Sequence, residues 1–178
     1  MKKIVYLVMA CLLLLSLCAC SSEPSLLGTA PVGNNSSADT PTVAKDATFK
    51  LGDSVELDGV MIRFAALDKS NGSDFNKPAD GNEFVLCEFE ITNNSAEDIS
   101  VSSMLSFEAY HDDYACDTSF SAMLEKGNKE QLDGTIAAGK KMMGVVGYEV
   151  PTDWEELEIH YTPSILSNSK IVFVATNS

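Results

Sequence analysis

The apolar residues between Thr48 and Ser178 recur at every second position, and this alternation limits the fold more than any other feature of the chain. It is clearest in residues 84–91, where one face carries Val85, Cys87, Phe89 and Ile91 and the other carries Glu88 and Glu90. The same alternation returns in residues 60–66, 99–109, 142–150, 157–161 and 171–173. Since successive side chains of a β-strand point to opposite faces, the pattern predicts strands with one buried face.

Short turn signals separate these predicted strands. They are Asn71-Gly72, Asp80-Gly81, Asn93-Asn94-Ser95, Ala138-Gly139 and Pro151-Thr152-Asp153. About seven strands at this spacing predict an all-β, antiparallel β-sandwich of two sheets. One segment departs from the pattern, because Phe120, Met123 and Leu124 have helical spacing, with Thr118 as a candidate N-cap and Gly127 as a stop. A short helix is predicted there.

The beginning of the chain has the organisation of a secretory signal peptide. Lys2 and Lys3 precede an apolar run from Ile4 to Leu17, and small residues follow. The alternative is an N-terminal membrane-spanning anchor. Such a helix needs about 20 apolar residues, and the polar Ser21 arrives too soon for it. We therefore predict a cleaved signal peptide.

The end of this segment, Leu17-Cys18-Ala19-Cys20, resembles the bacterial lipobox. That motif has an aliphatic residue three positions before the modified cysteine and a small residue directly before it, and Cys20 fits it better than Cys18. The resemblance implies a lipoprotein signal peptide in residues 1–19, cleavage after Ala19, a diacylglyceryl thioether on Cys20 and acylation, as by palmitate, of the new amino end. Because two or more acyl chains anchor stably, we expect the protein at the extracytoplasmic face of the cell membrane.

Residues 20–47 are predicted to be the lipidated cysteine and a flexible tether. Their composition is dominated by Ser, Thr, Pro, Gly, Asn and Ala, and they show no apolar periodicity that could bury a face. A flexible chain of this length has a root-mean-square span of roughly 30 Å. The folded domain is then expected in residues 48–178.

Several residues of the predicted domain resemble those of one family. They are Leu51-Gly52-Asp53, Pro78-x-x-Gly81-x-x-Phe84-Val85, Asn93, Ser102-Ser103 before Phe107, and Gly139 and Gly144 before Tyr148-x-Val150-Pro151. This series is similar to that of domain of unknown function 4352. The resemblance implies an extracellular lipoprotein of a bacterium, mostly Gram-positive, with an immunoglobulin-like β-sandwich. It implies no activity, because the family has no established shared one.

The charge of the chain limits its partners. Lys and Arg number 12 against 26 for Asp and Glu, which gives a net charge of −14. Loss of Lys2 and Lys3 with the signal peptide would bring it to −16. Nucleic acid is therefore not an expected partner. We expect a monomer that binds a protein or an envelope component, without a cofactor, through the segments 68–82 and 111–134.

Nothing in the sequence nominates a catalytic site. His111 and His160 fall in different predicted elements, and no HExxH, Gly-x-Ser-x-Gly or phosphate-binding glycine loop is present. We therefore predict that the protein is not an enzyme. The alternative is an extracytoplasmic hydrolase whose site is assembled from loops.

The acidic residues Asp112, Asp113 and Asp117 raise a second alternative, because calcium favours several oxygen ligands on a flexible loop. Their spacing matches no EF-hand, so a solvated turn is the favoured interpretation and no metal site is predicted. Cys87 and Cys116 are the thiols of the predicted domain and could pair outside the cell, but the favoured interpretation is that Cys87, on an apolar face, is a small buried residue.

A few side chains outside these clusters are also given expected positions. The single tryptophan, Trp154, is expected to pack over one end of the sandwich rather than to form a binding anchor. His160 is expected on the solvent face of its strand, because it alternates with apolar neighbours.

Overall fold

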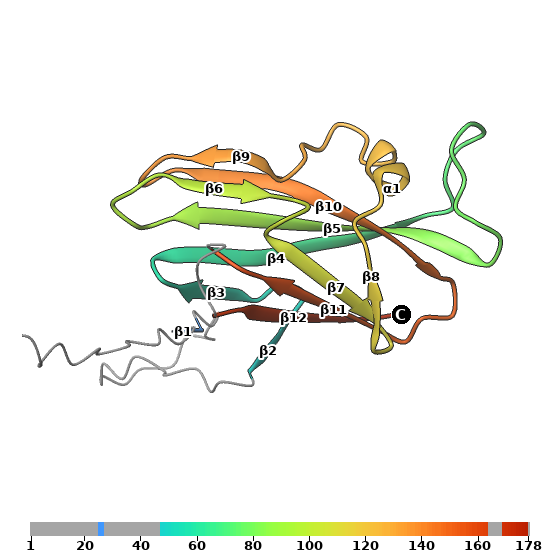
Figure 1. The fold of residues 1–178 in the computed structure, drawn as a ribbon, viewed down its shortest axis with the longest axis horizontal. Coiled ribbons are helices and arrows are strands. Elements are labelled where there is room, and N and C mark those ends of the chain that lie inside the picture. The colour runs from blue at the N-terminus through green and yellow to red at the C-terminus, as the bar shows by residue number, and fades with distance from the viewer. Residues whose placement is uncertain (1–24, 27–46, 164–168, 178) are drawn as a thin grey trace, which may run out of the picture.

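The computed structural model describes residues 25–26, 47–163 and 169–177, and these residues form two facing β-sheets (Figure 1). The first sheet contains, in spatial order, β1 (Ser25–Leu26), β3 (Ser54–Leu57), β4 (Val60–Ser70), β5 (Asn82–Asn93) and β10 (Lys141–Pro151). The second contains β2 (Thr48–Lys50), β12 (Ile171–Thr176), β11 (Glu156–Tyr161), β7 (Phe107–His111) and β8 (Tyr114–Cys116). A separate pair consists of β6 (Ile99–Ser102) and β9 (Asp133–Ile136).

The expected β-sandwich is confirmed, with two differences in detail. The described residues form twelve strands rather than about seven, because several short strands extend the sheet edges. One pair, β2 with β12, is parallel, whereas the pairs within the first sheet are antiparallel.

The core lies between the two sheets and is rich in aromatic rings. Phe64 and Phe89 of the first sheet stack with ring centroids 4.8 Å apart. Phe89 also lies 5.5 Å from Phe173 and 5.2 Å from Phe107, both in the second sheet. Phe107 in turn lies 5.1 Å from Tyr161. These five rings occupy inward-facing positions of the alternating pattern, and each is buried against a ring of the opposite sheet or of a neighbouring strand.

The predicted helix is present as α1 (Phe120–Leu124) on the outer face of the first sheet. Its N-cap is Ser119 rather than Thr118, because the Ser119 hydroxyl accepts a hydrogen bond from the Ala122 N–H at 3.1 Å. The buried helical residues are Ala122 and Met123, and Met123 packs with Leu86 and Val145. Phe120 and Leu124, expected to share the apolar face, are exposed.

Strand β10 is the last strand of the first sheet, but its outer edge is covered. The Val145 N–H donates to the Glu130 carbonyl at 2.9 Å, and the Ser119 N–H donates to the Gly147 carbonyl at 2.7 Å. A side chain at Gly144 would place its Cβ 2.9 Å from the Glu130 carbonyl oxygen, so this close approach requires glycine. The segments around Ser119 and Glu130 thus form hydrogen bonds with β10 backbone groups that would otherwise be unpaired at an open sheet edge.

The predicted signal peptide in residues 1–19, Cys20 and most of the predicted tether lie outside the described residues. Ser25 and Leu26 of the tether are described, and they form β1, paired with Glu56 and Val55 of β3. At least this part of the segment expected to be unstructured therefore adds to the sheet. Among residues 25–26, 47–163 and 169–177, no helix has the length and apolar character needed to cross a membrane.

Candidate functional site

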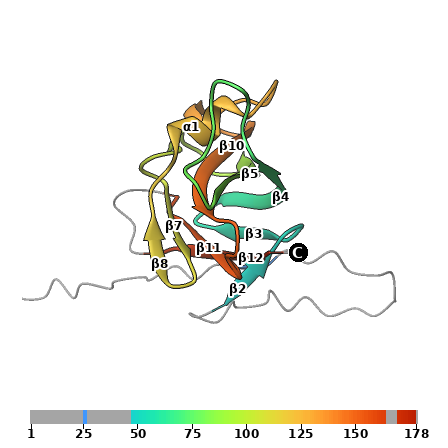
Figure 2. The same ribbon diagram turned by 90° about the vertical axis from the view of Figure 1, so that its right-hand side faces the viewer.

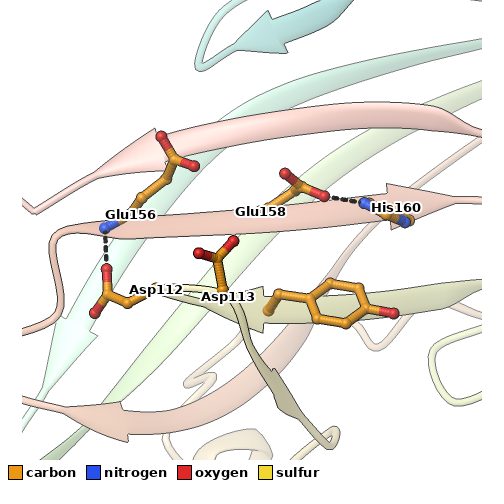
Figure 3. Close-up of a pocket in the computed structure, with 6 residues that line it drawn as sticks. Asp112, Asp113, Glu156, Glu158 and His160 are labelled. Atoms are coloured by element: carbon orange, nitrogen blue, oxygen red, sulfur yellow. Dashed lines mark hydrogen bonds and ion pairs between the residues drawn. The ribbon is translucent and has the colours of Figure 1, made fainter. Parts of the chain in front are cut away.

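Asp112 and Asp113 form the turn of the β7–β8 hairpin, with φ angles of 47° and 69°. Glycine or asparagine is usual where both central residues have positive φ. Here the Asp112 carboxylate accepts hydrogen bonds from the backbone N–H groups of Glu155, at 3.0 Å, and Glu156, at 2.9 Å (Figure 3). Asp112 thus fastens the turn to the beginning of β11, which is a structural role.

The acidic residues considered for calcium do not form a ligand set. Asp112 uses its carboxylate on backbone N–H groups, and Asp117 lies beyond the far end of β8 from the turn. Within residues 25–26, 47–163 and 169–177, no group of three His, Cys, Asp or Glu side chains is placed to hold a metal ion. The calcium alternative therefore gains no support from the geometry.

A shallow hollow of about 260 Å³ lies on the outer face of the second sheet beside this turn (Figure 3). Its lining residues are Tyr110, Asp112, Asp113, Glu156, Glu158 and His160. The His160 Nε2 pairs with the Glu158 carboxylate, and the imidazole lies 5.2 Å from the Tyr110 ring. His160 is on the outer face as expected, although these neighbours leave its side chain only 17% exposed.

The hollow is lined by four carboxylates, one imidazole and one phenol. None of its six lining residues is Ser, Thr, Cys or Lys. The second histidine does not join it, because His111 follows Phe107 and Ala109 on the inner face of β7 whereas His160 pairs directly with Glu108. The two histidines therefore belong to opposite faces of one sheet.

Cys87 and Cys116 approach the same core from opposite sheets. Cys87 is fully buried on β5, and Cys116 ends β8, half-buried against the core; both are free thiols here. Burial raises the pKa of Cys87, and negative charge on Cys116 raises it further. Burial also raises the pKa of Cys116 to about 11. Both groups are therefore protonated at neutral pH and are poor nucleophiles. The burial expected for Cys87 is confirmed, and its pairing with Cys116 stays a hypothesis.

Trp154 is buried, with 1% of its side chain exposed, between β10 and β11. Its Nε1 donates to the Glu83 carboxylate at 2.8 Å, and the Lys69 ammonium lies 5.1 Å from the ring centroid. The expected packing over an end of the sandwich is confirmed, and Trp154 is unavailable as an exposed anchor.

The loop between β4 and β5 has a defined conformation. Ser73 and Asn76 form an antiparallel bridge, with Asp74 and Phe75 as the turn between them. Gly72 has a φ of 78°, and a Cβ there would lie 2.1 Å from the Asn76 carbonyl oxygen, so only glycine fits. Phe75 at the turn is fully exposed. The expected loop began at residue 68, but β4 continues to Ser70.

This loop is fastened to α1. The Asn76 Nδ2 donates to the Ser121 carbonyl at 2.8 Å and to the Glu125 carboxylate at 2.7 Å. In Figure 2 the loop lies beside α1, in agreement with these contacts. Phe120 and Leu124 of α1 are 65% and 74% exposed. The two segments expected to bind a partner, 68–82 and 111–134, are therefore joined at one end of the sandwich. This junction carries three exposed apolar side chains, Phe75, Phe120 and Leu124.

Sequence reasoning did not single out Phe75. A lone aromatic residue between turn-forming Asn71-Gly72 and the polar residues before Gly81 was the available signal. The turn of the β7–β8 hairpin belongs to the same expected segment as α1, residues 111–134, but it lies away from α1 in both views (Figures 1 and 2).

Comparison with known proteins agrees with the fold. The family profile of the domain of unknown function DUF4352 matches residues 49–171. The yjhA protein from Bacillus subtilis has a similar structure, with a TM-score of 0.58 at 18% identity, over 71% of this chain and 98% of that one. No curated protein matches the chain.

Two further structures are similar. The ycdA protein of Bacillus subtilis subsp. subtilis str. 168, described as a candidate lipoprotein, has a TM-score of 0.57 at 20% identity; the match covers 67% of this chain and only 37% of that longer one. A candidate lipoprotein from Staphylococcus aureus has a TM-score of 0.52 at 14% identity, over 70% of this chain and 88% of that one. Because the profile spans most of the folded residues, this chain belongs to the DUF4352 family.

Proposed function

We propose that this protein is a lipoprotein, anchored through Cys20 at the extracytoplasmic face of the membrane, and that it acts there as a binding or accessory module for a protein or envelope component. The lipobox-like sequence before Cys20 supports the anchor. The two candidate lipoproteins among the similar structures agree with it.

The observation that carries the binding role is the junction between the β4–β5 loop and α1. Asn76 holds the two segments together with two hydrogen bonds of 2.8 and 2.7 Å. Loops on a rigid sandwich can vary in chemistry without disturbing the core, so a junction of two loops is a suitable recognition surface. The raised pKa values of Cys87 and Cys116 and the separation of the two histidines favour binding over catalysis.

Crosslinking in intact cells tests this proposal. The native chain and a variant with residues 71–81 replaced by a Gly-Ser segment of equal length are treated with a short amine-reactive crosslinker, and the adducts are identified by mass spectrometry. Leu51→Ser, at an exposed apolar residue on the β2–β3 turn, is the control. We expect the loop variant to lose partners that the native chain and the control keep. Recovery of the same partners by all three, or turnover of a substrate in a hydrolase screen, contradicts the proposal.

A further inference from the structure

We propose that Phe75, Phe120 and Leu124, here called the apolar tip, form the docking anchor for a partner protein whose contact surface combines an apolar pocket with lysine or arginine side chains. This inference rests on the proposed binding function and specifies the chemistry of the partner.

The apolar tip is held in place rather than left at the end of a loose loop. Phe75 is presented by a turn closed by the Ser73–Asn76 bridge, which only Gly72 permits at its base. Asn76, directly after Phe75, is hydrogen-bonded to Ser121 and Glu125 of the helical segment. These contacts keep a large apolar side chain in water, where it contributes nothing to the core. A pre-positioned aromatic residue is a suitable anchor, because little conformational entropy is lost on binding.

Phe120 and Leu124 extend the apolar tip along α1. They are four residues apart in one helix and therefore lie on the same face. Ser121 and Glu125, which bind the loop, are their direct neighbours in sequence. Exposed apolar residues are ordinary when scattered, but such residues gathered on two interlocked segments indicate a contact surface.

The charges of this chain indicate which side chains a partner would carry around the apolar contact. The nearby Lys129 is held by Asp68, at 2.5 Å, and Glu88, at 2.7 Å, and the Lys126 ammonium donates to the Lys129 carbonyl at 2.6 Å. Within the described part of the chain, neither Asp74 beside Phe75 nor the exposed Lys77 beside Asn76 makes an ion pair. The local charges are therefore mixed, and it is the net charge of −14 of the whole chain that favours cationic side chains around the apolar contact.

The same features argue against two other occupants. Anionic lipid headgroups and a second copy of this chain are both negatively charged and would be repelled. In both views α1 and the β4–β5 loop lie on the opposite side of the sandwich from β2, where the described chain resumes at residue 47 (Figures 1 and 2). The apolar tip is thus displaced from the end of the domain nearest the proposed anchor.

Site-specific photo-crosslinking of the full lipidated chain in intact cells tests the occupant. The photoreactive residue p-benzoylphenylalanine replaces Phe75, and in a control it replaces Tyr114, an exposed aromatic residue on the β7–β8 hairpin. We expect a discrete protein adduct from position 75 and none of that mass from position 114. Mass spectrometry should locate the crosslink in a segment that has lysine or arginine within a few residues of apolar ones. An adduct with lipid, an adduct with this same chain, an acidic crosslinked segment, or no adduct overturns the proposal.

A binding measurement then tests the anchor itself. The probe is a synthetic peptide with the sequence of the crosslinked segment, titrated against the full chain in detergent micelles. Phe75→Ala should weaken binding about 30-fold, the loss expected for one aromatic hot spot, and Tyr114→Ala should change it less than twofold. Binding should weaken as salt is raised, because the rim is charged. Unchanged thermal unfolding shows that the variants remain folded.

The outcomes separate this inference from the proposed function. If replacement of residues 71–81 abolishes partner crosslinking but Phe75→Ala binds the peptide within twofold of the native chain, the apolar tip is refuted and the binding module stands. If both changes leave partner capture intact, the binding function is refuted as well.

Discussion

Asn93 offers the most direct test of how the sandwich is held together. Its carboxamide is completely buried at the end of β5. The Nδ2 group donates to the Ile136 carbonyl at 2.9 Å and the Glu97 carbonyl at 2.7 Å, and Oδ1 accepts from the Ser95 N–H at 3.0 Å and the Ser95 hydroxyl at 2.7 Å. One side chain therefore joins β5, the following turn and β9.

Replacing Asn93 with alanine should lower the free energy of unfolding by about 3–5 kcal/mol. The contact with Ile136 is buried, and leaving that carbonyl without a partner costs about 1–3 kcal/mol. The other three contacts are partly accessible to water, so each contributes about 0.5–1 kcal/mol. A loss of this size is a large part of the 5–15 kcal/mol that is typical of a folded domain.

Urea unfolding of a soluble form, residues 21–178, followed by Trp154 fluorescence, measures this loss. With a urea dependence of about 2 kcal/mol per molar, the unfolding midpoint should fall by about 2 M. Asn94→Ala is the matched control, because its amide is exposed and makes one 3.3 Å contact with Glu56. The hydrogen-bond reasoning is refuted if the two midpoints differ by less than about 0.5 M.

Three further predictions concern the cysteines. Cys20→Ala should abolish incorporation of a clickable fatty acid in cells and Cys18→Ala should not; label retained by the first variant excludes Cys20 as the lipid site. Thiol counting on the unfolded, unreduced domain determines whether Cys87 and Cys116 pair, and two free thiols exclude the disulfide, whose closure would contribute about 3–4 kcal/mol. If they are free, the folded domain should lose stability as pH rises from the ordinary thiol pKa of 9.0, because the unfolded Cys116 ionises there and the folded one only at about 11; a pH-independent midpoint between pH 8 and 10 contradicts this.

The strands were predictable because burial of one face of a strand places an apolar residue at every second position of the sequence. The inward set of β5 and the end of β10 at Pro151 follow from residue order alone. Leu86 was not predictable, because it lies on the outward face of β5 and is buried in a small cluster with Val145 and with Met123 of α1, 37 positions later. Burial by a distant segment leaves no local periodicity.

Side-chain geometry decided the remaining differences. Both Thr118 and Ser119 can cap a helix, but the Thr118 hydroxyl donates to the Ser103 carbonyl at 3.2 Å and Ser119 takes the cap. Asp112 and Asp113 adopt positive φ without glycine, which costs roughly 1 kcal/mol per residue. The two backbone hydrogen bonds to the Asp112 carboxylate offset that cost, and they come from Glu155 and Glu156 at the beginning of β11, more than forty residues away.

The position of β1 bears on where a partner could approach. In the proposed arrangement the lipid is on Cys20, five residues before Ser25, and a fully extended chain covers at most about 3.5 Å per residue. While Ser25 pairs with Glu56, the β3 edge therefore stays within roughly 18 Å of the lipidated cysteine. In both views β3 lies below the β4–β5 loop and α1 (Figures 1 and 2). A short anchor at one edge and an apolar tip displaced from it favour a partner that rises from the membrane beside the domain, such as the exposed part of a membrane protein, over the lipid surface itself.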